Sequence, residues 1–141
     1  MKTLSILSTI LAANLAFACP NLSGKFLCND EEFGNYEQTI SQTGSGDNTV
    51  YTTYNDLDGS ETIVADGKWK EADINGQKLK TKATCVGKVL NVQMELDTGS
   101  EVMEALNMVQ LDRNNNIYNY TTVLFRNSGQ SMSYKETCTR L

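Results

Sequence analysis

From residue 19 onward, short runs of alternating apolar and polar residues follow one another along the chain, separated by turn residues. In 89–96 the even-numbered positions hold Leu, Val, Met and Leu, whereas Asn, Gln and Glu lie between them. This alternation is typical of a β-strand with one buried face. The segment 117–126 is rich in β-branched and aromatic residues, which also favour strands. The pattern therefore predicts an all-β protein.

Turn residues mark where these strands end. Pairs such as Asp66-Gly67 and Asn75-Gly76 suit hairpin turns, because both residues tolerate positive φ. Strands are expected over 24–29, 35–43, 50–54, 61–65, 68–76, 78–85, 89–96, 117–126 and 131–140. The segment 101–111 is ambiguous, because Ser100 could cap a short helix while the approach to Asp112 resembles a hairpin arm.

The spacing of the turns indicates the architecture. Because hairpins rather than long crossovers separate the segments, we expect a single antiparallel up-and-down β-barrel of about eight strands, which protects its edges by closing. A β-sandwich is the alternative. No internal repeat or second domain is evident, so residues 19–141 are expected to form one β-barrel domain.

The N-terminal 18 residues have the pattern of a cleaved signal peptide. A positive start, Met1-Lys2, precedes an apolar run over 4–15, and Ala16-Phe17-Ala18 then offers a cleavage site before Cys19. Acylation of Cys19 is the alternative at this junction. The sequence therefore predicts an exported protein, periplasmic or secreted, in a compartment that permits disulfides. The short, compact signal is of bacterial type.

Four cysteines, Cys19, Cys28, Cys85 and Cys138, remain after this segment. Their even number and the lack of C-x-x-C spacing predict two disulfides rather than a metal or redox site. In a closed barrel the first and last strands are neighbours, which would favour a bond from Cys19 or Cys28 to Cys138. The pattern Cys19–Cys28 with Cys85–Cys138 is equally allowed, so the connectivity stays open.

Composition removes several classes of function. The chain has no histidine, which excludes histidine-based catalysis and histidine metal ligands. From residue 19 onward it has 11 basic and 17 acidic residues, a net charge of −6, which disfavours nucleic-acid binding. No apolar run after the signal approaches the roughly 20 residues of a transmembrane helix. No cofactor is expected, and a carboxylate-based hydrolase is the remaining enzymatic alternative.

Two groups of side chains are candidates for ligand binding. Aromatic residues that could line a barrel lumen are Tyr54, Trp69, Tyr118 and Tyr120. Strand alternation places Lys78, Lys80 and Lys82 on one face, where they could meet an anionic surface such as a phosphorylated glycan. The structural alternatives are aromatic core packing and a solvated lysine face that guards an edge strand.

A third pattern is the turn after residue 111, where Asp112, Asn114 and Asn116 alternate like calcium ligands. Ile117 stands where such a loop needs glycine, so we interpret the segment as a hairpin turn.

Both ends of the domain carry features of a known family. Leu22-Ser23-Gly24-Lys25-Phe26 opens the first strand, and Arg140 and a nearby cysteine lie at the end of the last. In these features the chain resembles the calycins, the lipocalin-type barrels, with Phe26 in the place of their tryptophan. The resemblance implies an eight-stranded antiparallel barrel, an arginine packed on the aromatic ring, and an internal ligand site.

Together these observations predict a non-catalytic exported binding module that carries a small amphipathic or apolar ligand in its lumen. A carrier should enclose a cavity of a few hundred Å³. The alternative is a surface interaction protein, such as an inhibitor or adhesin, with a filled core and functional loops. The expected partner is accordingly a small molecule, or an extracytoplasmic protein or glycan.

Overall fold

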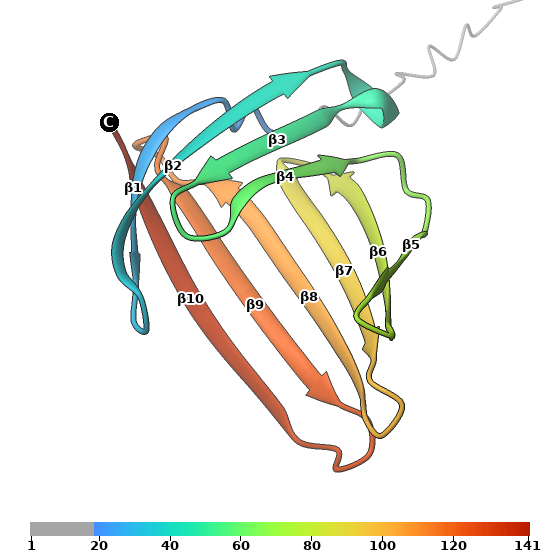
Figure 1. The fold of residues 1–141 in the computed structure, drawn as a ribbon. Coiled ribbons are helices and arrows are strands. Elements are labelled where there is room, and N and C mark those ends of the chain that lie inside the picture. The colour runs from blue at the N-terminus through green and yellow to red at the C-terminus, as the bar shows by residue number, and fades with distance from the viewer. Residues whose placement is uncertain (1–18) are drawn as a thin grey trace, which may run out of the picture.

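In a computed structural model, which describes residues 19–141, ten antiparallel strands form one curled sheet (Figure 1). The predicted signal peptide lies outside the described residues. The strands are β1 (Gly24–Asp30), β2 (Gly34–Thr43), β3 (Val50–Asn55), β4 (Gly59–Val64), β5 (Lys70–Ile74), β6 (Gln77–Val86), β7 (Val89–Asp97), β8 (Val102–Leu111), β9 (Ile117–Phe125) and β10 (Ser131–Arg140). A short 3₁₀ helix, η1 (Gly46–Asn48), precedes β3. No helix within 19–141 is long and apolar enough to cross a membrane.

The strands form an up-and-down meander in which β1 pairs with both β2 and β10. The order in the sheet is β4-β3-β2-β1-β10-β9-β8-β7-β6-β5, so the first and last strands are neighbours. The all-β, antiparallel architecture is thus as predicted, with ten strands rather than about eight. Nine of the ten strands correspond to expected segments, and the tenth is β8, which the ambiguous segment 101–111 forms.

The barrel is open along one seam. β4 and β5 follow each other in sequence but are the two free edges of the sheet. Between them, the N–H of Ala65 donates to the Thr49 carbonyl at 2.9 Å, and the N–H of Gly67 donates to the Ala83 carbonyl at 2.9 Å. The Asp66-Gly67 pair therefore carries the chain from the end of β4 across to the side of β6, instead of forming a tight hairpin between β4 and β5, and a half-barrel results.

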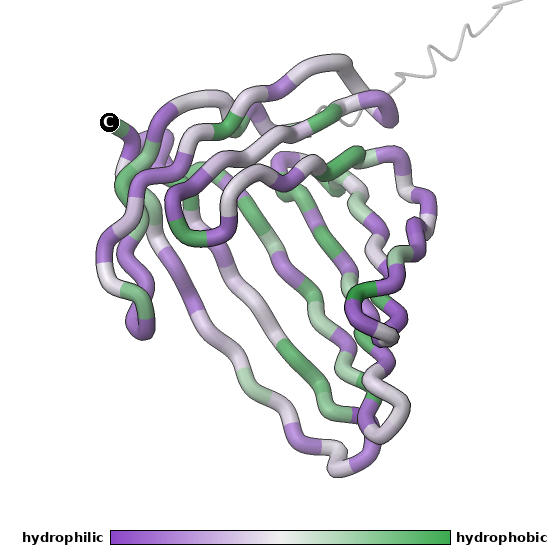
Figure 2. Tube along the Cα trace, viewed as in Figure 1, coloured by the Kyte–Doolittle hydropathy of each residue, from purple (hydrophilic) through white to green (hydrophobic). Residues whose placement is uncertain are grey.

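Alternation along each strand divides the sheet into an inner and an outer face. The inner face forms the core where β1–β4 arch over one end of the longer strands β6–β10 (Figure 1). Phe26 and Cys28 are fully buried there, and Tyr51, Leu90 and Ile117 are almost so. Toward the opposite end the inner face of β6–β10 is only partly covered, and Figure 2 shows hydrophobic residues at the lower end of β9.

Two disulfides hold this arrangement together. Cys28 and Cys138 lie directly opposite each other on β1 and β10, with their Cα atoms 4.0 Å apart. Cys19, before β1, is bonded to Cys85 on β6, with a Cα separation of 5.1 Å. The expected bond between the first and last strands is confirmed for Cys28. The nearest-in-sequence pattern is wrong, because the curl of the sheet brings Cys19 to β6 rather than to Cys28.

Arg140 closes the end of the core near the C-terminus. Its guanidinium lies 4.7 Å from the centroid of the Phe26 ring, the packing that the calycin resemblance implies. Nη1 donates to the Ser23 carbonyl at 2.8 Å, and Nε donates to the Asn115 carbonyl at 3.1 Å. Gly24 has φ +150°, and a Cβ there would lie 2.3 Å from Nη1 of Arg140. A side chain at this position would therefore be strained and would displace the Arg140 guanidinium.

The turn after β8 is held by the side-chain carboxylate of Asp112, which accepts backbone N–H groups of the turn. Oδ1 of Asp112 accepts the N–H groups of Asn114 at 2.8 Å and Asn116 at 2.9 Å. These hydrogen bonds keep the pKa of Asp112 below its ordinary value. The carboxylate is thus occupied by the turn, in agreement with the hairpin interpretation.

Candidate functional site

A cavity of about 220 Å³ lies between the arch of β2–β4 and the inner face of β7–β10. Its apolar wall includes Ile40, Ile63, Leu90, Val92 and Met94. These side chains come from strands far apart in the sequence, and they meet because the even positions of β2 and β7 and the odd positions of β4 all point inward. The arrangement suits the apolar part of a small ligand.

Glu136 is a carboxylate in this cavity. It lies on the inner face of β10, and the hydroxyl of Tyr36 on β2 donates to its Oε1 at 2.8 Å. Desolvation by the surrounding residues raises the pKa of Glu136 above its ordinary value, and the Tyr36 hydrogen bond offsets only part of that effect. The pKa of Tyr36 is raised as well, mainly by burial and then by its bond to Glu136.

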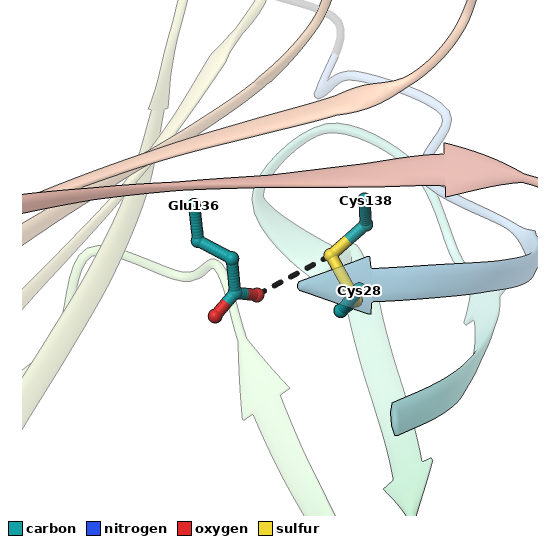
Figure 3. A group of neighbouring side chains, drawn as sticks. All are labelled: Cys28, Glu136 and Cys138. Atoms are coloured by element: carbon teal, nitrogen blue, oxygen red, sulfur yellow. Dashed lines mark hydrogen bonds between the residues drawn. A yellow bond between two sulfur atoms is a disulfide. The ribbon is translucent and has the colours of Figure 1, made fainter. Parts of the chain in front are cut away.

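Glu136 also lies beside the disulfide of β1 and β10. Its Oε1 is 3.3 Å from Sγ of Cys138 (Figure 3). This is a contact rather than a conventional hydrogen bond, because a disulfide sulfur has no proton to donate. Cys28, Cys138 and Glu136 are close enough together for a metal, but metals bind the thiolate form of cysteine and both sulfurs are oxidised here. The group is therefore no metal centre in this state.

Three further polar residues form a hydrogen-bonded cluster on the inner face of β8 and β9, beside the β10 strand that carries Glu136. Asn119 on β9 is directly opposite Glu136, and its Oδ1 accepts from Nδ2 of Asn107 on β8 at 2.6 Å. The same Nδ2 donates to Oγ1 of Thr121 at 2.8 Å. Thr121 is only 3% exposed, so the cluster is held in place from within the sheet. Glu136, Asn119, Asn107 and Thr121 form a polar floor within an otherwise apolar face.

The side chains predicted to bind a ligand lie outside this cavity. Trp69 and Tyr54 are 51% and 55% exposed, and Tyr118 and Tyr120 are on the outer face of β9. Lys78, Lys80 and Lys82 are on the outer face of β6, opposite the inward-facing Leu79 and Ala83.

Two of these aromatic rings lie beside lysines. Nζ of Lys82 lies 5.1 Å from the Trp69 ring centroid, and Nζ of Lys135 lies 5.9 Å from the Tyr120 ring centroid. The structure brings Trp69 to Lys82 but does not gather these residues into one site.

Sequence reasoning missed the polar floor, although one signal pointed to it. In β8 the odd-numbered positions face inward. They hold Met, Ala, Val and Leu, and Asn107 is the one polar residue among them. A polar residue at an inward position of a strand calls for a partner, and Asn119 and Thr121 on the neighbouring strand supply it.

In comparisons with known proteins, no family model and no curated protein matches the chain. The interpretation of the site therefore depends on its geometry and chemistry.

The raised pKa of Glu136 predicts how its substitution changes stability with pH. A carboxyl group whose pKa is higher in the folded state contributes most below its unfolded pKa, near the ordinary 4.5, and that contribution is lost as the pH rises through the folded value. Glu136→Gln keeps an acceptor for Tyr36 but does not ionise. We expect wild type to lose stability relative to the variant as the pH rises from 4.5, as measured by urea unfolding at several pH values. A constant difference would contradict the prediction.

Proposed function

We propose that the protein is a non-catalytic, exported carrier that binds a small amphipathic molecule inside the half-barrel. The observation that supports this most directly is the cavity of about 220 Å³, which is lined by side chains from seven strands. It combines an apolar wall with a few polar groups that converge on one region, as is typical of small-molecule sites. A ligand bound there would be held by burial and oriented by hydrogen bonds.

The open end of the half-barrel provides room for a longer molecule. Beyond Met94 the inner face continues through Leu79, Leu96, Met103 and Phe125, which lie opposite one another on adjacent strands. All four are only partly buried. An apolar tail that extended from the cavity would cover these side chains and gain roughly 25 cal/mol for each Å² removed from water.

The disulfides support an extracytoplasmic location. Both bonds span long stretches of chain, with separations of 66 and 110 residues, and such bonds persist in oxidising compartments. Together with the signal-peptide pattern of residues 1–18, they favour the periplasm or the extracellular medium as the place where the carrier works.

Filling the cavity should abolish binding. Met94→Trp places a larger side chain in it, whereas Gln93→Trp adds the same side chain to the outer face of the same strand. We expect the uncharged dye N-phenyl-1-naphthylamine, which fluoresces in apolar surroundings, to bind wild type with a dissociation constant on the order of 100 µM. The Gln93→Trp protein should bind similarly, and the Met94→Trp protein at least tenfold more weakly.

In this experiment a low concentration of dye is titrated with each protein, and circular dichroism checks that each variant is folded. Equal binding by the two tryptophan variants would place the dye elsewhere and contradict the carrier proposal.

A surface interaction protein is the second candidate, and the exposure of Trp69 favours it. Trp69 is 51% exposed and borders a shallow groove with Leu106 and Leu124 on the outer face. A glycan array probed with wild type and Trp69→Ala tests this candidate, which requires binding by wild type alone.

A further inference from the structure

The cavity wall carries acidic side chains but no basic ones. Glu61 and Glu136 line the cavity, and the described residues that line it include no Lys or Arg. Lys70, beside the seam, is paired with Asp66 at 3.3 Å, and Arg140 lies at the closed end of the core. A molecule inside the half-barrel would therefore meet carboxylates and neutral groups.

Glu136 is the better placed of these two acids. Glu61 is exposed, whereas Glu136 is half-buried and belongs to the polar floor, directly opposite Asn119. Tyr36 occupies its Oε1, and no hydrogen bond from the described residues reaches its Oε2. A partly desolvated carboxylate gains most from a charged donor, because hydrogen bonds between ions are about twice as strong as neutral ones. An ammonium group is such a donor.

The polarity of the inner face changes along the length of the strands. The polar floor lies in the register rows that contain Glu136 and Asn107. The next two rows toward the open end are almost wholly apolar. The nearer row consists of Met132, Val123, Ala105, Met94 and Thr81, and the farther row consists of Phe125, Met103, Leu96 and Leu79. A bound molecule would therefore place its polar end at Glu136 and its apolar end toward the opening.

From these observations we infer that the ligand is a small amphipathic amine, whose ammonium group binds Oε2 of Glu136 and whose apolar body lies along the rows that lead to the open end. The inference rests on the proposed carrier function and adds the charge and orientation of the ligand. Tyr36 acts as a positioning residue, since its hydroxyl holds Oε1 and leaves Oε2 without a hydrogen bond from the described residues.

Three indoles that differ only in the group at the end of the side chain test this inference. Tryptamine carries an ammonium group, tryptophol a hydroxyl, and indole-3-propionate a carboxylate. With wild-type protein at pH 7, isothermal titration calorimetry should show that tryptamine binds about tenfold more tightly than tryptophol and that indole-3-propionate binds most weakly. This comparison requires no variant, so a folding defect cannot obscure it.

Two glutamate variants then locate the preference. Glu136→Gln should lower tryptamine affinity about tenfold, to the level of tryptophol, and leave tryptophol binding unchanged. Glu37→Gln removes an equal charge from the exposed outer face of β2, where Glu37 pairs with Lys25, and should preserve the preference. A merely structural role of Glu136 would change the affinity for all three indoles alike.

The inference is overturned if the indoles bind equally, if the alcohol or the acid binds best, if tryptamine does not bind, or if Glu136→Gln keeps the preference. In each of these cases the carrier proposal survives, provided that the naphthylamine dye still binds and Met94→Trp abolishes that binding. If the dye does not bind to wild-type protein, or if it binds outside the cavity, the carrier proposal itself has failed.

Discussion

Replacing Cys28 and Cys138 together by alanine is expected to lower the free energy of unfolding by about 4 kcal/mol. The bond closes a loop of 110 residues, and a cross-link across so long a loop removes much conformational entropy from the unfolded chain. It also joins β1 to β10, the pairing that makes the meander curl into a half-barrel. For a domain with a total stability of roughly 5–15 kcal/mol, this is a large share.

Urea unfolding of wild type and of the double variant measures the effect. Cys19→Ala with Cys85→Ala is the matched comparison, because it opens a loop of 66 residues and should cost nearly as much by the same entropic argument. A loss below about 1 kcal/mol for the Cys28 and Cys138 pair would mean that the unfolded chain remains compact without the bond.

Local patterns were sufficient for most of the strands. The alternation of 89–96 predicts β7, and Leu90 and Val92 are buried as it requires. The segment 101–111 is ambiguous in sequence because Ser100 could cap a short helix, whereas the approach to Asp112 resembles a hairpin arm. It is a strand because β7 and β9 pair with it along its whole length, so tertiary context overrides the local preference.

The parts that could not be predicted depend on contacts between distant strands. The bond of Cys19 to Cys85 follows from the curl of the sheet, which no local pattern encodes. The open seam depends on where Ala65 and Gly67 place their hydrogen bonds, since an Asp-Gly pair alone favours a hairpin.

The candidate site shows the same limit. Alternation correctly places Tyr118 and Tyr120 on one face of β9, opposite Ile117 and Thr121. It does not say which face is the inner one. That is decided by Cys138, which lies opposite Ile117 and is bonded to Cys28 in the core. Tyr118 and Tyr120 are therefore on the outer face. The cavity, which was expected to be lined by these aromatic rings, is lined instead by Asn107, Asn119 and Glu136.

Phe26→Ala is expected to lower the free energy of unfolding by roughly 3–5 kcal/mol, as is usual when a buried aromatic ring is truncated. The Phe26 ring is fully buried, and the Arg140 guanidinium covers it at 4.7 Å from the centroid. Its removal would leave a cavity at the closed end of the core. Arg140 would also lose the ring as a partner, while its bonds to two backbone carbonyls restrict any collapse into the space.

Leu27→Ala is the matched control for this prediction, because Leu27 is the next residue of β1 but faces outward and is 39% exposed. Its truncation should cost at most about 1 kcal/mol by the usual scale for burying part of an apolar side chain. Urea unfolding of the two variants separates the inner from the outer face of β1. Equal losses would contradict the assignment of the core to the Phe26 side. A large loss for Phe26→Ala alone would show that the inner side of β1, where the nearby disulfide also lies, carries the packing that holds β1 in the half-barrel.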